Sequence, residues 1–179
     1  MECDGFQFKA PCTILTVGGS GSGKSVFCRT LCQNLQFFSQ PVEEVLWSYG
    51  VKTSAEELPN VTYFEGLYPI EMLQQRCSDG KHRLLVIDDQ VCELRENKTY
   101  LPTMFTRYSH HLNLSVIVIT QSMFDISRIC RLSTHYLVLF KSLNDTLNIQ
   151  TIGRQIFAKQ FKWFYDSYED ATRERHGYL

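Results

Sequence analysis

The chain has 179 residues, 44% hydrophobic and 21% charged, a composition typical of one globular domain with its own core. Its 18 basic and 19 acidic residues give a formal net charge of −1, which argues against a general nucleic-acid coat, since such proteins are usually basic. Residues 1–10 lack the apolar run of a signal peptide, and no run reaches the roughly 18 apolar residues of a membrane span, so we expect a soluble intracellular protein.

Short apolar runs alternate with helical patterns along the chain. In chain order, the predicted strands are 12–17, 42–49, 61–64, 83–88, 114–120 and 136–140. The predicted helices are 25–38, 69–77, 100–111, 145–156 and 157–172. The polar segment 53–60 is predicted to be a loop or a helical turn. The tail 173–179 is polar and ends on Tyr178 and Leu179, which could begin a further strand that is truncated here.

This alternation favours a parallel sheet with helices on both faces, because short, continuously apolar strands are buried on both sides. The strands should be joined by right-handed crossovers. The sequence contains no internal repeat, low-complexity tract or linker. We therefore expect a three-layer α/β fold and a single domain over 1–179.

A phosphate-binding motif follows the first strand. The segment Gly18-Gly19-Ser20-Gly21-Ser22-Gly23-Lys24-Ser25 matches G-x-x-x-x-G-K-[ST] in full, between a β-rich run and a helical pattern. Its glycines let backbone N–H groups turn inward around phosphates, and the helix that begins near Gly23 directs its positive end at the same anion. A chance match in a glycine-rich turn is the alternative, and the flanking strand and helix argue against it.

The motif predicts a nucleoside triphosphate, taken as ATP, with Mg²⁺. Lys24 would contact the β- and γ-phosphates, and the Ser25 hydroxyl would ligate the magnesium ion. The predicted nucleotide-binding residues are Gly18, Gly19, Ser20, Gly21, Ser22, Gly23, Lys24, Ser25 and Val26.

Two carboxylates end the apolar strand 83–88. Asp88 and Asp89 follow Leu84-Leu85-Val86-Ile87, and the carboxyl ends of parallel strands are where such sheets bind ligands. Asp88 is predicted to hold Mg²⁺ directly or through its water, and Asp89 to polarise the attacking water as a general base. A solvated acidic turn is the alternative interpretation.

A further apolar strand, 114–120, ends in Gln121 and Ser122. We expect it to lie between the phosphate-loop strand and the Asp88 strand, as in one large branch of P-loop proteins. Gln121 could then donate to a phosphate oxygen and accept from the attacking water. A polar cap of the strand is the alternative.

Arginines near this strand could stabilise charge on the transferred phosphoryl group, in cis or in a neighbouring subunit. Arg107 and Arg131 are the first candidates, with Arg128 beside them, although a solvated face or an ion pair is the more common role of a single arginine. His110 and His111 have no third ligand nearby, which favours a structural or surface role.

The seven cysteines are odd in number and scattered through predicted core elements, which indicates reduced intracellular thiols. Cys28 and Cys32 are four residues apart, but no second pair completes a zinc site.

Taken together, several motifs carry a family resemblance over nearly the whole chain, from about Cys12 onward. They are Gly18 to Ser25, Val86-Ile87-Asp88-Asp89, Arg107 with His110-His111-Leu112-Asn113, Val116 to Ser122, Arg131, and Leu137-Val138-Leu139-Phe140-Lys141. The chain resembles the FtsK–HerA superfamily of P-loop ATPases, in particular the DNA-packaging ATPases of poxvirus-like viruses, Polinton elements, adintoviruses and virophages.

The resemblance implies an ATP-driven motor that moves double-stranded DNA into a capsid. It implies a homo-oligomeric ring, capsid or portal-vertex partners, and a location in the host cell, in a virus factory or the nucleus, or in the virion. Lys24, Asp89, Gln121, Arg107 and Arg131 would be catalytic, while Ser25 and Asp88 would hold Mg²⁺. An arginine finger is expected from a neighbouring subunit, with Arg107 first in order.

The chain departs from the family in lacking a separate DNA-guiding domain and a strong basic patch. The nearest candidates for DNA contact are Lys159 with Lys162, and Arg173 with Arg175. A ring would multiply a few such cations per subunit.

Three other classes of function stay open at this stage. A nucleoside or small-molecule kinase would usually need an arginine-rich lid, which the sequence does not indicate. A GTP-dependent switch would usually carry Asn-Lys-x-Asp, whereas Asn97-Lys98 continues with Thr99-Tyr100. A scaffold with a vestigial site is disfavoured by the intact Lys24 and Asp88.

Overall fold

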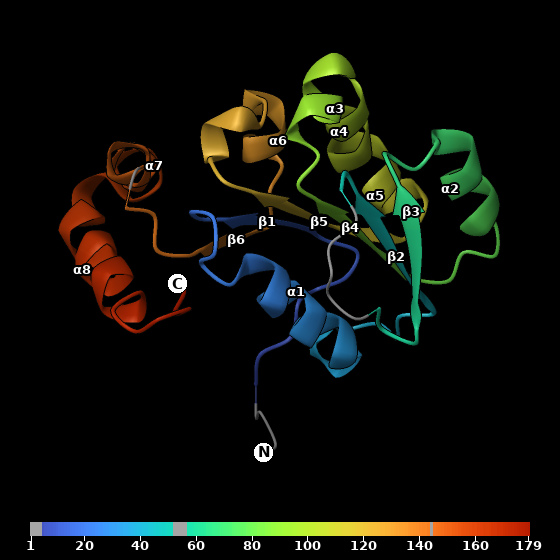
Figure 1. Cartoon of the computed structure of the whole chain (residues 1–179), viewed down its shortest axis with the longest axis horizontal. Helices are drawn as coiled ribbons and strands as arrows, with labels where there is room; N and C mark the ends of the chain where they lie inside the picture. Colours follow the sequence, from blue (N-terminus) through green and yellow to red (C-terminus); the bar gives the residue numbers. More distant parts are fainter. Residues whose placement is uncertain (1–4, 52–56, 144) are drawn as a thin grey trace.

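A six-stranded sheet in which all neighbouring strands are parallel forms the centre of the molecule (Figure 1). The computed structural model describes residues 5–51, 57–143 and 145–179. The strand order is β3-β2-β4-β5-β1-β6. The strands are β1 (Thr13–Val17), β2 (Glu44–Tyr49), β3 (Val61–Glu65), β4 (Arg83–Asp88), β5 (Leu114–Thr120) and β6 (Tyr136–Leu139).

The order of the strands confirms the predicted three-layer P-loop fold. Strand β5 lies between the phosphate-loop strand β1 and the Asp88 strand β4, pairing with both over most of its length. On its other side β1 pairs with β6. All carboxyl ends of the strands therefore meet at one edge of the sheet, which brings distant polar segments together.

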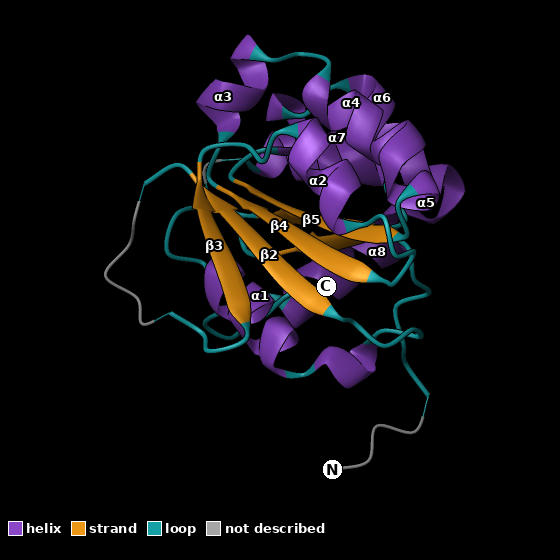
Figure 2. Cartoon of the chain, turned by 90° about the vertical axis from the view of Figure 1, so that its right-hand side faces the viewer, coloured by secondary structure: helices purple, strands orange, loops and turns teal. Residues whose placement is uncertain are grey.

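The sheet is buried on both faces because alternate side chains of each strand point to opposite sides. One face packs on α1 (Lys24–Gln33), and Cys28, Leu31 and Cys32 contribute to its core. Of the remaining helices, α2 to α6 cover the other face (Figure 2), and α7 and α8 flank the sheet beside β6 (Figure 1). These helices are α2 (Ile70–Arg76), α3 (Val91–Glu96), α4 (Tyr100–Thr103), α5 (Ser109–His111), α6 (Arg128–Leu132), α7 (Thr146–Phe157) and α8 (Phe161–Ala171).

Several predicted helix boundaries were wrong. The helix predicted over 25–38 ends at Gln33, and a 3₁₀ turn over Leu35–Phe37 follows, because Asn34 leaves the helical conformation. The helix predicted over 100–111 has the predicted bounds, although a π-helical turn over Met104–Tyr108 separates α4 from α5 within it. The short helices α3 and α6 were not predicted, because six and five residues give too little periodicity.

The tail forms a short additional pairing. Phe140 and Tyr178 make an isolated antiparallel bridge at the outer side of β6. The further strand that the sequence suggested for the tail 173–179 is therefore limited to this one bridge. Residues 53–56 of the predicted loop 53–60 lie outside the described residues. That residues 1–179 make one domain stays a prediction.

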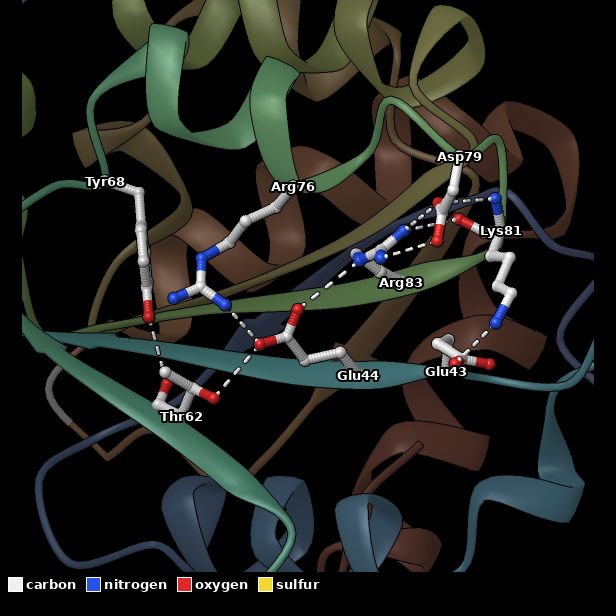
Figure 3. Close-up of polar contacts among 8 residues, drawn as sticks. All are labelled: Glu43, Glu44, Thr62, Tyr68, Arg76, Asp79, Lys81 and Arg83. Carbon is white, nitrogen blue, oxygen red and sulfur yellow. Dashed lines mark hydrogen bonds and ion pairs between the residues drawn. The ribbon is translucent and has the colours of Figure 1, made fainter.

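The amino-terminal edge of the sheet is held by a network of ion pairs (Figure 3). Glu44 accepts from Arg76 at 2.5 Å and from Arg83 at 3.4 Å. Asp79 accepts from Arg83 at 2.6 Å, and this contact lowers the pKa of the Asp79 carboxyl to about 2. These contacts join β2, β4 and α2.

None of the described helices combines the length and the hydropathy that crossing a bilayer requires. The cysteines that the structure describes are free thiols: Cys12, Cys28, Cys32, Cys77, Cys92 and Cys130.

Candidate active site

The phosphate loop connects β1 to α1 in the predicted place, and two of its glycines are required by geometry. Gly23 has a φ of 104°, a conformation that residues with a side chain rarely adopt. A Cβ on Gly18 would lie 2.5 Å from the Cβ of Phe140, so the loop can approach β6 only without a side chain there. The loop thus depends on the glycines that the motif supplies.

Lys24 is buried in the loop, with 8% of its surface exposed. Its Nζ donates to the carbonyl oxygens of Gly18 and Gly19 at 2.7 and 2.8 Å. Burial lowers the pKa of its ammonium, while the nearby carboxylates of Asp88 and Asp89 oppose that shift. The loop carbonyls therefore hold the cation beside the helix start, where it can meet phosphate oxygens.

Ser25 and Asp88 lie next to each other although 63 residues separate them. The Ser25 hydroxyl donates to Oδ1 of Asp88 at 3.4 Å. Burial is the largest cause that raises the pKa of the Asp88 carboxyl, followed by the charge of Asp89, and contacts with Ser25 and Trp47 reduce this shift. Asp88 is thus a partly buried acid with incomplete compensation of its charge, which a cation would stabilise.

This pair fits the predicted magnesium ion chemically. A hydroxyl and a carboxylate are hard oxygen donors of the kind that Mg²⁺ prefers, and here they lie within 3.4 Å of each other. Ser25 and Asp88 are the residues that would hold the ion.

Asp89 is exposed and begins the turn after β4 with a φ of 51°. The next residue, Gln90, is buried and donates from Nε2 to Ser48 Oγ at 2.6 Å and to the Gly66 carbonyl at 3.2 Å. Gln90 thereby ties the acid-bearing turn to the ends of β2 and β3. The sequence reasoning missed this residue, because nothing local marks a glutamine as a tether.

A cavity of about 260 Å³ opens at the carboxyl edge of the sheet, above these residues. The predicted residues Lys24, Ser25, Asp88, Asp89 and Gln121 all line it, so residues from three separate segments of the chain meet in one place. Ser20 and Gly21 of the phosphate loop also contribute to its wall.

The far side of the same cavity is aromatic, which was not predicted. Trp47 and Tyr49 of β2 and Tyr63 of β3 line it, together with Arg29 of α1 and Glu57. Trp47 and Tyr49 are two residues apart in β2 and so share one face of the sheet, but their place beside the acids depends on the pairing of β2 with β4. The aromatic half lies beyond the acids, on the side away from β1.

The predicted arginines lie elsewhere. Arg107 is exposed on the π-helical turn, with its guanidinium 5.5 Å from the ring centroid of Tyr108. Arg131 donates to the Ile126 carbonyl at 2.5 Å and lies 4.8 Å from the ring centroid of Phe124. Neither lines the cavity, and Arg128 is exposed on α6. In this chain the arginine on the cavity wall is Arg29.

Val26, the last predicted nucleotide-binding residue, lies in the first turn of α1 with 66% of its surface exposed. Its backbone is thus placed to extend the line of loop amides, and its side chain leaves the core.

No family model matches the chain, and no curated protein matches it by sequence. Solved structures of similar fold were found. The genome packaging NTPase B204 from Sulfolobus turreted icosahedral virus 2, in complex with AMP, matches with a TM-score of 0.57 at 14% identity, over 94% of this chain and 90% of that one. The DNA-packaging ATPase B204 from Sulfolobus Turreted Icosahedral Virus gives a TM-score of 0.58 at 13% identity, over 84% and 85%.

The cytoplasmic domain of EssC matches with a TM-score of 0.55 at 20% identity, over 80% of this chain and 34% of that one. Our chain therefore corresponds to about a third of that EssC chain. These matches, all at 20% identity or less, show that the chain shares its fold with the B204 ATPases and with the EssC domain.

Proposed function

We propose that the protein is an ATP-driven motor that translocates double-stranded DNA during genome packaging. The observation that carries this proposal is the meeting of Lys24, Ser25, Asp88, Asp89 and Gln121 around one cavity. The similarity in fold to the B204 packaging ATPases over most of both chains supports it.

In this proposal the residues of the cavity divide the work of hydrolysis. Lys24 and the loop amides bind the β- and γ-phosphates, and Lys24 exchanges its bonds to the Gly18 and Gly19 carbonyls for bonds to phosphate oxygens. Asp89 accepts the proton of the attacking water. Gln121 orients that water and contacts the γ-phosphate. Ser25 and Asp88 would hold a magnesium ion, which would supply positive charge to the phosphates.

The motor acts as a homo-oligomeric ring in which a neighbour completes the site. Arg107 and Arg131 lie outside the cavity of their own chain, which is compatible with a role in trans. Exposed Lys159 and Lys162 would supply contacts to DNA phosphates, repeated in each subunit. The proposed setting is an infected host cell, with capsid or portal-vertex proteins as partners.

A phosphotransferase is the second candidate, and the aromatic half of the cavity favours it. Trp47, Tyr49 and Tyr63 lie beyond the acids, where a planar acceptor such as a nucleoside could stack near the γ-phosphate. A motor has no need of such an acceptor.

The test is ATP hydrolysis by the assembled protein with and without linear double-stranded DNA, for the wild type, Lys24→Ala and Asp89→Asn. We expect DNA to stimulate hydrolysis, and both substitutions to abolish the stimulated rate. Hydrolysis that ignores DNA, together with transfer of the γ-phosphate to a nucleoside, would replace the motor by the phosphotransferase.

A further inference from the structure

After α8 the chain returns to the phosphate loop. Leu139 and Leu179 exchange two backbone hydrogen bonds of 2.8 and 3.0 Å. The ring of Tyr178 lies 4.8 Å from that of Phe27 and 5.1 Å from that of Phe140, measured between centroids. The C-terminal end of the chain thus lies between β6 and α1 (Figure 1).

Within this tail, His176 lies directly against the phosphate loop. A Cβ on Gly23 would be 2.9 Å from Nδ1 of His176. His176 is exposed and has a φ of 66°, a conformation that costs free energy in a residue other than glycine. The fold therefore holds an imidazole at the start of α1 in a strained conformation.

The order of the strands determines which end of a nucleotide faces this tail. Asp88 and Gln121 follow β4 and β5, which lie on one side of β1. The tail pairs with β6, on the opposite side of β1. A triphosphate held by the loop, with its γ-phosphate at Asp88 and Gln121, therefore directs its nucleoside toward β6 and the tail.

We propose that His176 and Tyr178 form the nucleoside-binding wall of the site. Val26 projects from the first turn of α1 with 66% of its surface exposed, and Tyr178 keeps 48% of its surface exposed. His176 at Gly23 and the half-exposed Tyr178 beside Phe27 supply aromatic rings next to the start of α1, and aromatic rings bind planar bases by stacking. This inference rests on the orientation of the triphosphate in the proposed function.

Calorimetric binding to the whole chain tests this wall with two probes, Mg²⁺–ATP and Mg²⁺–tripolyphosphate, of which the second has no nucleoside. We expect His176→Ala and Tyr178→Ala to weaken ATP binding about tenfold, as loss of one stacking contact predicts, and to leave tripolyphosphate binding unchanged. Tyr178→Phe keeps the ring and should bind ATP as the wild type does. His111→Ala, which removes an exposed histidine at the opposite edge of the sheet, is the matched control.

Equal weakening for both probes would overturn the inference, because the tail would then act on the phosphates or on the fold. Unchanged or tighter ATP binding in both alanine variants would overturn it as well, the latter by showing that the tail covers the site. Lys24→Ala separates the two proposals. If it abolishes binding of both probes while the tail variants bind normally, the phosphate site stands and only the nucleoside wall fails.

Discussion

The amino- and carboxyl-terminal edges of the sheet both carry charged side chains, and they differ in how these charges are compensated. At the amino edge, Glu44 and Asp79 accept from arginines, and the pKa of Asp79 is lowered to about 2 (Figure 3). At the carboxyl edge, burial raises the pKa of the Asp88 carboxyl and lowers that of Lys24.

This difference indicates that the two edges have different roles, the amino edge in stability and the carboxyl edge in ligand binding. Contacts at the amino edge favour the ionised forms of their residues, so they stabilise the fold at neutral pH. At the carboxyl edge, burial disfavours the charged forms of Asp88 and Lys24, and a bound cation and phosphate would supply compensating charge. Sites of this kind commonly cost stability for the sake of function.

The largest effect should come from removing the cation at the carboxyl edge. We expect Lys24→Ala to lower the rate of ATP hydrolysis about a thousandfold, because a preorganised charge beside the transferred phosphoryl group is lost. Phosphate release under steady-state conditions measures it. Lys81→Ala, which removes an exposed lysine paired with Glu43 at the amino edge, should keep the wild-type rate. Equal losses of hydrolysis rate in both variants would contradict the different roles of the two edges.

Asp88→Asn should separate function from stability. We expect hydrolysis to fall about a hundredfold, whereas the melting temperature without nucleotide should rise by about 2–4 °C, corresponding to roughly 1 kcal/mol. The physical reason is that the amide removes a carboxylate whose ionised form is penalised by burial and by Asp89. Thermal unfolding followed by circular dichroism measures the change. A lower melting temperature would show that Asp88 stabilises the fold after all.

Glu44→Gln should have the opposite effects to Asp88→Asn, lowering stability and leaving hydrolysis unchanged. Arg83, whose side chain is 9% exposed, loses part of its charge compensation, so we expect the free energy of unfolding to fall by about 1–2 kcal/mol with the hydrolysis rate unchanged. Urea unfolding measures it. The neighbouring Glu43→Gln is the control, since its exposed pair with Lys81 should contribute less than about 0.5 kcal/mol.

The smallest effect concerns pH. Because the folded pKa of Asp79 is lowered from 3.8 to about 2, its stabilisation is present above pH 3.8 and is lost as pH falls toward 2. Asp88 has the opposite sign, since its raised pKa means that protonation removes a cost. In urea unfolding between pH 5 and 2, Asp79→Asn should flatten the loss of stability, and Asp88→Asn should steepen it. Identical pH profiles of the two variants would refute the contrast.

Much of this arrangement was predictable because its signals are local. The loop motif between a β-rich run and a helical pattern predicted the place of Lys24 and Ser25. The apolar run before Asp88 predicted a buried strand that ends in an acid, and Gln121 was found in the same way. The position of β5 between β1 and β4, expected from the likeness to one branch of P-loop proteins and not from a local signal, was confirmed.

Other features could not be predicted because they depend on contacts between distant segments. Gln90 matters only because the ends of β2 and β3 lie beside it. The aromatic half of the cavity needs β2 and β3 to lie next to β4. Helices α3 and α6 escaped prediction for a different, local reason, since six and five residues are too few for periodicity to reveal a helix.

The sequence by itself determined the chemistry of the phosphate loop, the strand-ending acids and the α/β fold class, because glycine conformation and apolar periodicity act over a few residues. Only the tertiary structure decided that Gln90 contacts the ends of β2 and β3, that Arg29 rather than Arg107 lines the cavity, and that His176 lies against Gly23. The physical reason is that these placements follow from how the strands pair and how the tail packs on β6, and residues far apart in the chain set both.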